Sequence, residues 1–165
     1  MTIRALGAGD FAAYRQVRLR ALAEHPEAFT SSVEEEDSAA GDARLARRLA
    51  GSADRMLGAF EADALVGTIG LSVDPRAKVR HRGLVVGMYV VPEQCGRGVG
   101  RALVEAQIAQ ARTAGLSGLH LTVTAGNDAA RRLYERAGFA VVGRDPDAMR
   151  ITGVSYDKLI MYRPL

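Results

Sequence analysis

The amino-acid sequence predicts a mixed α/β fold, in which helices flank a sheet. Residues 84–91, Leu-Val-Val-Gly-Met-Tyr-Val-Val, form an apolar run of the length of a buried strand. A glycine-rich stretch at 95–101 follows, and after it apolar residues recur at helical spacing. Strand-like and helix-like segments occur along the whole chain, which is the pattern of a domain with a sheet and packed helices.

The N-terminal half is expected to contain a strand, two helices and a β-hairpin. Asp10 is the predicted N-cap of the first helix, because its carboxylate can accept from free N–H groups, and His25-Pro26 ends that helix. The second helix carries several arginines on its polar side, and the hairpin turns at Ala62-Asp63. In chain order these elements are the strand 2–6, the helices 11–24 and 39–50, and the hairpin strands 56–61 and 65–73.

The C-terminal half is expected to contain four strands and two helices. The first strand shows no polar alternation, so we expect it to be buried on both faces. Gly115 and Gly138 follow the two helices, where a glycine commonly ends a helix. In chain order these elements are the strand 84–91, the helix 99–114, the strand 119–124, the helix 129–137, and the strands 140–142 and 156–162.

The composition is that of an ordinary globular domain. The chain has 165 residues, 48% apolar and 25% charged, which fits one domain over 1–165 with a buried core. It has no apolar run of membrane-spanning length, no signal-peptide pattern and a single cysteine, so we expect a cytoplasmic protein without a membrane partner. A net charge of +3 and the absence of Trp argue against a nucleic-acid partner. The three His and one Cys show no metal-binding spacing, so no metal is expected.

The stretch at 95–101, Cys-Gly-Arg-Gly-Val-Gly-Arg, has the properties of an anion site, and we call it the glycine turn. It joins a buried strand to a helix, whose first N–H groups have no intrahelical partner and whose dipole adds positive charge. Glycines let the main chain approach a phosphate closely, and Arg97 and Arg101 add positive charge. The turn therefore predicts a site for a diphosphate.

Two common diphosphate motifs do not fit the glycine turn. A P-loop requires G-x-x-x-x-G-K-[ST], and no lysine follows these glycines. A dinucleotide-binding turn requires G-x-G-x-x-G or a final Ala, but the last position is Arg101 when counted from Gly96 and Leu103 when counted from Gly98. What remains is G-x-G-x-G followed directly by a helix.

Two segments resemble motifs of the GNAT family of N-acetyltransferases. Residues 89–103 resemble the acetyl-CoA-binding segment, although Cys95 stands where the family has Arg or Gln. Residues 127–139, Asn-Asp-Ala-Ala-Arg-Arg-Leu-Tyr-Glu-Arg-Ala-Gly-Phe, resemble the family's later motif. Because the two motifs occur in the family's order, the chain is identified as a member of this family, least clearly over its first 50 residues.

The resemblance implies a fold and an activity. The fold is a mostly antiparallel sheet of about seven strands with flanking helices, whose two parallel central strands splay apart to admit pantetheine. The activity is transfer of acetyl from acetyl-CoA to a primary amine of a small molecule or peptide, by direct attack in a ternary complex. The alternative is a non-catalytic module that senses acyl-CoA. A homodimer is a further expectation from the fold.

The resemblance also implies which residues bind the cofactor. Main-chain groups of the buried strand hold the thioester carbonyl and the pantetheine amides, as fixed dipoles in the manner of an oxyanion hole. The glycine turn holds the diphosphate mainly through backbone amides, so Cys95 weakens one side-chain contact without removing the site. The residues concerned are Met88, Tyr89 and Val90 in the strand, and Cys95, Gly96, Arg97, Gly98, Val99, Gly100 and Arg101 in the turn.

Tyr134 is the candidate general acid. A phenol, with a pKa of about 10, stays protonated at neutral pH and can hydrogen-bond the leaving sulfur; the alternative is a tyrosine that only packs in the core. Ala130 lies on the same helix face and belongs to the predicted cofactor site. Asn127 is expected to cap the helix, to hydrogen-bond pantetheine, or both.

The acceptor site is the part that the sequence predicts least well. Family acceptor pockets are built from irregular segments, here 24–40 and 143–157. An acidic run at 34–37 could attract a cationic amine and accept its proton, with Glu34 and Glu35 as the candidates. The alternative for this run is a solvated face at the start of a helix. Cys95 is not linked to a histidine by any nucleophile motif.

Overall fold

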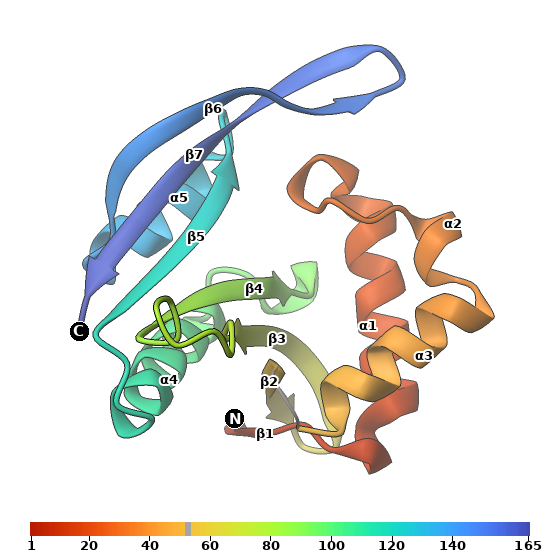
Figure 1. Cartoon of the computed structure of the whole chain (residues 1–165). Helices are drawn as coiled ribbons and strands as arrows, with labels where there is room; N and C mark the ends of the chain where they lie inside the picture. The colour runs from red at the N-terminus through yellow and green to blue at the C-terminus, as the bar shows by residue number, and fades with distance from the viewer. Residues whose placement is uncertain (52–53) are drawn as a thin grey trace.

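The computed structural model describes residues 1–51 and 54–165, and within them the chain forms a seven-stranded sheet (Figure 1). The strand order is β1-β2-β3-β4-β5-β7-β6. Neighbouring strands are antiparallel except for β4 and β5, which confirms the predicted mixed sheet. The strands are β1 (Thr2–Ala5), β2 (Asp54–Glu61), β3 (Ala64–Ser72), β4 (Arg82–Val90), β5 (Gly118–Thr124), β6 (Ala140–Ile151) and β7 (Val154–Pro164).

Helices pack on the sheet from different sides. Figure 1 shows α1, α2 and α3 on the right and α4 at the lower left, with α5 drawn behind β5 and β7. The first and third helices contact β3 and β2, and α4 contacts β2, β3 and β4. The helices are α1 (Phe11–Glu24), α2 (Val33–Glu36), α3 (Ala39–Leu49), α4 (Val99–Thr113) and α5 (Asp128–Arg136), with short 3-10 turns η1 (Ala8–Asp10), η2 (Pro26–Ala28) and η3 (Pro92–Gln94).

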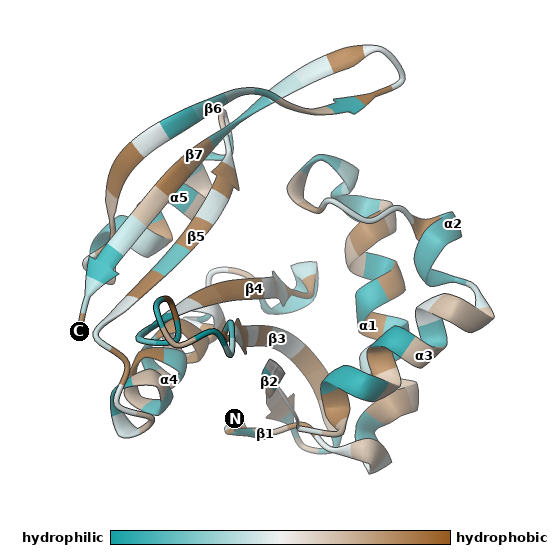
Figure 2. Ribbon diagram, viewed as in Figure 1, coloured by the Kyte–Doolittle hydropathy of each residue, from teal (hydrophilic) through white to brown (hydrophobic). Residues whose placement is uncertain are grey.

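The hydrophobic core joins the two halves of the sheet. Ile69 of β3, Leu103 of α4 and Leu119 of β5 are fully buried in one cluster that also contains Met161 of β7. Figure 2 shows the apolar residues concentrated on the central strands β3, β4 and β5. Because each fully buried Leu or Ile contributes about 1.5–3 kcal/mol, this cluster fixes the two parallel strands relative to each other.

The parallel pair is short. Residues 82–84 of β4 pair with residues 118–120 of β5, at the start of both strands. Beyond this point the two strands separate, as Figure 1 shows, while β5 continues to pair with β7 along its whole length. The splayed arrangement predicted for the central strands is therefore present.

The prediction that the strand at 84–91 is buried on both faces is wrong. Val85 and Tyr89 are buried, whereas Leu84, Val86 and Met88 are half-buried. The half-buried residues are apolar for a different reason: they line the opening between β4 and β5.

The prediction of short strands at 140–142 and 156–162 is also wrong in extent. The two strands form a long hairpin that includes nearly all of 143–157, the segment expected to be irregular, and turns at Thr152-Gly153. Pro146 concealed the strand from sequence analysis. It lies in a register shift between Asp145 and Met149 on an edge strand, where a missing N–H costs no ladder bond.

The predicted helix ends are confirmed, with one difference in chemistry. Gly115 and Gly138 follow α4 and α5 with φ of 74° and 87°, as expected for glycines that end helices. Asp10 occupies the N-cap position of α1, but its carboxylate accepts from Arg4 and from the N–H of Gly7 instead of capping the helix. Among the described residues no helix has the length and apolarity needed to cross a membrane.

Candidate active site

A cleft of about 300 Å³ opens where β4 and β5 separate. Both strands, the helix α5 and the loop before α2 contribute to its walls, together with three basic side chains. The lining residues are Arg18, Ala28, Phe29, Thr30, Ser31, Arg48, Leu84, Val85, Val86, Gly87, Met88, Leu121, Thr122, Val123, Thr124, Asn127, Ala130, Leu133, Tyr134 and Lys158.

A bulge shapes the β4 wall of the cleft. Val86 pairs with Gly70 and Tyr89 with Thr68, so two residues of β4 stand opposite one residue of β3. Gly87 lies in this bulge with a φ of 61°, which favours glycine, and its carbonyl accepts from Thr68 Oγ1 at 2.9 Å. The parallel ladder ends at Leu84, so beyond it the main chain of β4 has no β5 partner among the described residues. An extended amide chain inserted here could complete the ladder.

The structure separates the three β4 residues predicted to bind the cofactor. Met88 lines the cleft, whereas Tyr89 and Val90 are not among the lining residues. The Tyr89 hydroxyl donates to Glu24 Oε2 at 2.5 Å, and burial together with this carboxylate raises the pKa of the phenol. Its side chain therefore holds β4 to α1, so a cofactor contact by Tyr89 would come from its main chain.

Tyr134 of α5 lies in the wall of the cleft. Its side chain is 6% exposed and packs against the Phe139 ring edge to face, with centroids 5.7 Å apart. The hydroxyl hydrogen-bonds to no described residue, yet it is not among the polar atoms sealed from solvent. Burial raises the pKa of this phenol, so it is protonated at neutral pH and can donate a hydrogen bond into the cleft.

Asn127 caps α5 and also lines the cleft. Its Oδ1 accepts from the N–H of Ala130 at 3.1 Å, which confirms the predicted N-cap. The amide nitrogen of the Asn127 side chain remains as a donor for a ligand. Ala130 lies one turn before Tyr134 on the cleft side of α5. This face of the helix therefore presents the helix start capped by Asn127, the small side chain of Ala130 and the phenol of Tyr134.

The N-terminus of α4 has the geometry of an anion site. Gly98 is its N-cap, with a φ of 83° and without a side-chain cap, and the first intrahelical bond runs from the Ala102 N–H to the Gly98 carbonyl. The three preceding N–H groups, those of residues 99–101, therefore have no intrahelical partner. A Cβ added at Gly96 or Gly98 would meet no heavy atom within 4 Å, so the space beside this backbone is open.

The other residues of the glycine turn differ in their surroundings. Val99 is buried in the core and anchors the start of the helix. Cys95 is exposed, and its thiol lies 3.6 Å from the Val91 carbonyl oxygen. Arg97 is exposed, whereas Arg101 is engaged by Glu105 at 2.7 Å. Of the two arginines expected to assist, Arg101 must leave an ion pair to contact a diphosphate.

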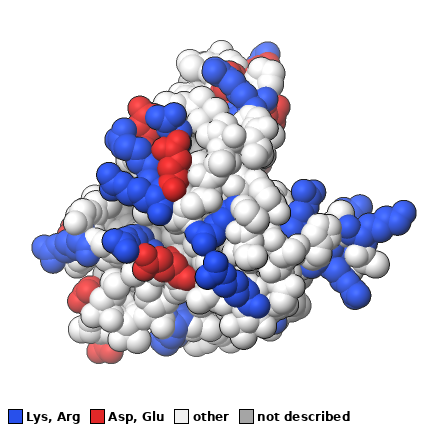
Figure 3. Space-filling view, turned by 90° about the vertical axis from the view of Figure 1, so that its left-hand side faces the viewer, with Lys and Arg blue, Asp and Glu red and all other residues white. Residues whose placement is uncertain are grey.

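These features fit coenzyme A, a polyanion with an amide-bearing arm. The uncapped start of α4 and the open space at Gly96 and Gly98 suit a diphosphate, and the unpaired edge of β4 suits the arm. On the side of the molecule that carries α4 and α5, basic side chains outnumber acidic ones (Figure 3). The residues thus provide both main-chain donors and a favourable field.

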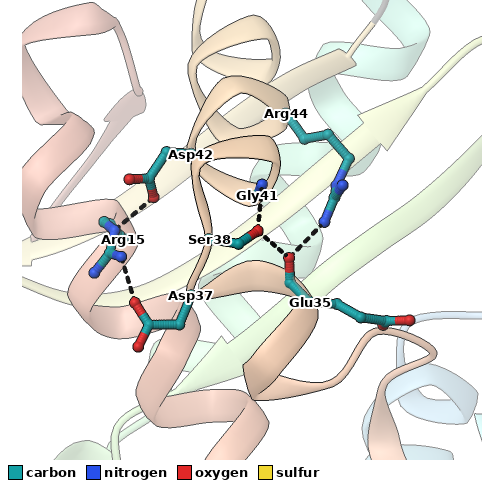
Figure 4. A network of polar contacts seen from close by, with 7 residues as sticks. All are labelled: Arg15, Glu35, Asp37, Ser38, Gly41, Asp42 and Arg44. Atoms are coloured by element: carbon teal, nitrogen blue, oxygen red, sulfur yellow. Dashed lines mark hydrogen bonds and ion pairs between the residues drawn. The ribbon is translucent and has the colours of Figure 1, made fainter.

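The structure does not bring Glu34 or Glu35 to the cleft. Both are exposed on α2, and Glu35 folds back so that its carboxylate accepts from the Ser32 N–H in a capping box. In Figure 4 the Glu35 carbonyl accepts from Ser38 and Arg44, while its carboxylate points away from this network. Their role in acceptor binding stays a prediction, and within the described part of the chain no acidic residue lines the cleft.

Sequence analysis missed several lining residues. Leu84, Val86 and Gly87 had a usable signal, since a glycine inside an apolar strand often marks a bulge. Arg18 and Lys158 had none, because each looks like a solvated charge in its own segment. Within the described ranges, no three or more His, Cys, Asp or Glu side chains gather in a way that could hold a metal ion.

Three features of this site occur together: the splayed parallel strands β4 and β5, the uncapped start of α4 after the glycine turn, and the buried phenol of Tyr134. They define a class of protein, a transferase domain that takes its acyl group from a coenzyme A thioester. Residues 18–139 match the model of the Acetyltransferase (GNAT) family, which covers more than half of the chain. The chain belongs to the GNAT family of acetyltransferases, whose cosubstrate is acetyl-CoA.

The curated relatives are longer than this chain. A mycothiol acetyltransferase of Thermobispora bispora is 35% identical over 136 residues, which cover 79% of this chain and 43% of the relative. One from Propionibacterium freudenreichii is 44% identical over 66 residues, 40% of this chain and 21% of the relative. The chain thus spans less than half the length of these relatives.

Solved structures match the fold over its whole length. An acetyltransferase of Salmonella typhimurium, solved with its cofactor acetyl-CoA, has a TM-score of 0.82 and 26% identity, covering 100% of this chain and 94% of that one. A GNAT-family acetyltransferase of Streptococcus pneumoniae has a TM-score of 0.80 and 26% identity, covering 99% of both chains.

Proposed function

We propose that this domain transfers the acetyl group of acetyl-CoA to a primary amine of a small molecule, by direct attack in a ternary complex. The observation that carries the proposal is the cleft between β4 and β5, with main-chain donors along one wall and Tyr134 in the other. Names of the relatives favour a small-molecule acceptor over a peptide, as does the modest cleft volume of about 300 Å³.

Bound acetyl-CoA would supply an activated thioester. The unpaired N–H groups of β4 near the bulge, around Met88 and Tyr89, would hold the thioester carbonyl and stabilise the negative charge that develops on its oxygen. Gly96–Arg101 would bind the diphosphate through the uncapped start of α4. Both sites use backbone groups, so they are fixed before the substrate arrives.

Tyr134 would assist departure of the sulfur. As the carbon–sulfur bond breaks and the nitrogen–carbon bond forms, negative charge develops on the sulfur, and the protonated phenol would donate a hydrogen bond to it. Asn127 and Ala130 would position the pantetheine arm beside this hydroxyl. The proton released by the attacking amine would leave to solvent, since no described residue of the cleft lining carries a carboxylate to receive it.

The proposal is tested by measuring thiol release from acetyl-CoA with a panel of amines: amino acids, polyamines, aminoglycosides and peptides. We expect amine-dependent release with at least one small acceptor. Tight binding of acetyl-CoA without turnover on any amine would instead support the alternative, a module that senses acyl-CoA.

Two further predictions belong to the whole protein. We propose that it acts in the cytoplasm, because its single cysteine, Cys95, is free and exposed, which suits a reducing compartment. The expected homodimer is tested by light scattering of the purified chain.

A further inference from the structure

The charge of the cleft is one-sided. Its lining includes three basic side chains, Arg18 of α1, Arg48 of α3 and Lys158 of β7, which we call the basic wall, and no Asp or Glu among the residues whose side chains the structure describes. Although Glu36 pairs with Arg18, such a lining favours an anion over a polycationic amine.

The basic wall does not belong to the predicted coenzyme A diphosphate site. No residue of the glycine turn lines the cleft, and the wall comes from α1, α3 and β7 instead of α4. The cofactor phosphates and the basic wall are therefore two separate sites, and the wall is available to the other substrate.

Arg18 is the most deeply buried member of the wall. It is 7% exposed, and its Nη2 donates to Glu36 Oε1 at 3.2 Å, while its guanidinium lies 4.8 Å from the centre of the Phe29 ring. Its Nε–H has no partner among the described residues. That nitrogen is sealed from solvent, whereas Nη1 forms no hydrogen bond to a described residue and is not among the sealed atoms, so the guanidinium can donate from Nη1 to a further acceptor such as a carboxylate.

Lys158 faces the cleft from the opposite element. It is half-buried on β7, opposite Thr124 of β5, and forms no ion pair with a described residue. Burial lowers the pKa of its ammonium group, and the nearby Asp145 opposes this effect. An anion bound in the cleft would offset the cost of this partly buried charge.

We propose that the acceptor is a small amine that carries a carboxylate, of the α-amino acid class, and that the basic wall binds this carboxylate. The inference rests on the proposed acetyl transfer and names its substrate class. Positive charge beside the acceptor also lowers the pKa of its ammonium group, which favours the neutral amine that attacks the thioester. This effect suits a cleft whose described lining residues offer no carboxylate as a base.

Substrate pairs test the inference directly. Thiol release from acetyl-CoA is compared for the common L-amino acids, their C-terminal amides and linear diamines. We expect the best amino acid to exceed its own amide and every diamine by about tenfold or more in kcat/KM. Turnover with amides or diamines at equal or higher kcat/KM would overturn the inference while leaving the acetyltransferase proposal intact. No turnover in these groups, with turnover of another small amine such as an aminoglycoside, would also overturn the inference alone, and no turnover with any amine of the full panel would overturn both.

Lysine variants provide a matched control, because the chain has only two lysines, Lys78 and Lys158. Lys158→Gln should raise KM for the amino acid about tenfold and leave KM for acetyl-CoA unchanged. Lys78→Gln, on the exposed loop between β3 and β4, should change neither constant.

Arg18→Lys keeps the buried charge but removes the planar fork of the guanidinium group, so it should also raise KM for the amino acid. An unchanged amino acid KM in both Lys158→Gln and Arg18→Lys would contradict the role of the wall.

Discussion

The glycine turn and the basic wall are built in opposite ways. The turn is one continuous stretch, and we propose that its main-chain N–H groups, uncapped at the start of α4, bind the diphosphate. The wall is assembled from Arg18, Arg48 and Lys158, which come from distant parts of the chain and would bind the acceptor through their side chains.

This difference shows how the two sites, the glycine turn at the cofactor end and the basic wall at the acceptor end, can change independently. A main-chain site tolerates many side chains, so the departure at Cys95 leaves the uncapped helix start in place. A side-chain site changes with single substitutions, so acceptor choice can shift while the cofactor end stays fixed. The predictions below act on one end, on the other, or on Tyr134 between them.

The largest effect is expected at Tyr134. Tyr134→Phe removes the hydroxyl that faces the cleft and should lower kcat about 100-fold, with both KM values within about twofold. Tyr14→Phe is the control, because the Tyr14 hydroxyl is buried, has no partner among the described residues and does not line the cleft. A full rate in Tyr134→Phe would show that the tyrosine only packs in the core.

The pH profile tests the same hydroxyl. Burial raises the pKa of Tyr134, so the donor form persists to a higher pH than in a free phenol, whose pKa is about 10. Under saturating substrates kcat should therefore rise or stay level as the pH increases from 7 to about 10. A loss of the donor between pH 8 and 9, seen as a falling kcat in the wild type but not in Tyr134→Phe, would contradict this environment.

The corner between α2 and α3 supports the acceptor end. A Cβ at Gly41 would lie 2.1 Å from the carbonyl oxygen of Glu36, the residue that pairs with Arg18. Gly41→Ala should therefore lower the free energy of unfolding by about 2 kcal/mol and raise KM for the acceptor. Gly9→Ala, where the added Cβ meets nothing, should do neither. The free energy of unfolding of both variants is measured by urea titration, and KM for the acceptor by steady-state kinetics.

Alanine variants of the two glycines at the ends of α4 distinguish the effect of backbone strain from an effect on cofactor binding. Gly98 and Gly115 have φ of 83° and 74°, and an added Cβ is unobstructed at both. Ala at either position should cost about 1 kcal/mol of stability. Gly98→Ala alone should raise KM for acetyl-CoA, by about tenfold. Equal effects of both variants on this KM would remove the glycine turn from the cofactor site.

The smallest effect is expected from the exposed ion pairs around α2. Arg15 donates to Asp37 at 2.5 Å and to Asp42 at 2.6 Å, which ties α1 to the corner shown in Figure 4. Because exposed pairs are screened by solvent, Arg15→Gln should raise the acceptor KM by less than about threefold, and added salt should reduce the difference. Arg150→Gln, in the β6–β7 hairpin, is the control and should leave KM unchanged.

Sequence analysis predicted what depends on local backbone chemistry. The helix-ending conformations of Gly115 and Gly138 and the cap at Asn127 follow from helix rules, and the structure confirms them. The place of Tyr134 in the cleft followed from the family motif.

What sequence analysis missed depends on tertiary position. Arg18 and Lys158 have ordinary sequence surroundings, and only the packing of α1 and β7 around the cleft brings them together. The long hairpin over 143–157 was hidden by Pro146, which an edge strand tolerates. Glu34 and Glu35 were chosen for their charge, and the short helix α2 leaves both exposed.

The independence of the two ends is tested most directly by combining Gly98→Ala with Lys158→Gln. KM for acetyl-CoA and for the best amino acid is measured in the wild type, both single variants and the double variant. We predict that Gly98→Ala changes only the first constant and Lys158→Gln only the second, and that the double variant shows both changes within about 0.5 kcal/mol of additivity. If each single variant shifts both constants, or the double variant departs from additivity by more than about 1 kcal/mol, the two ends are not separate sites.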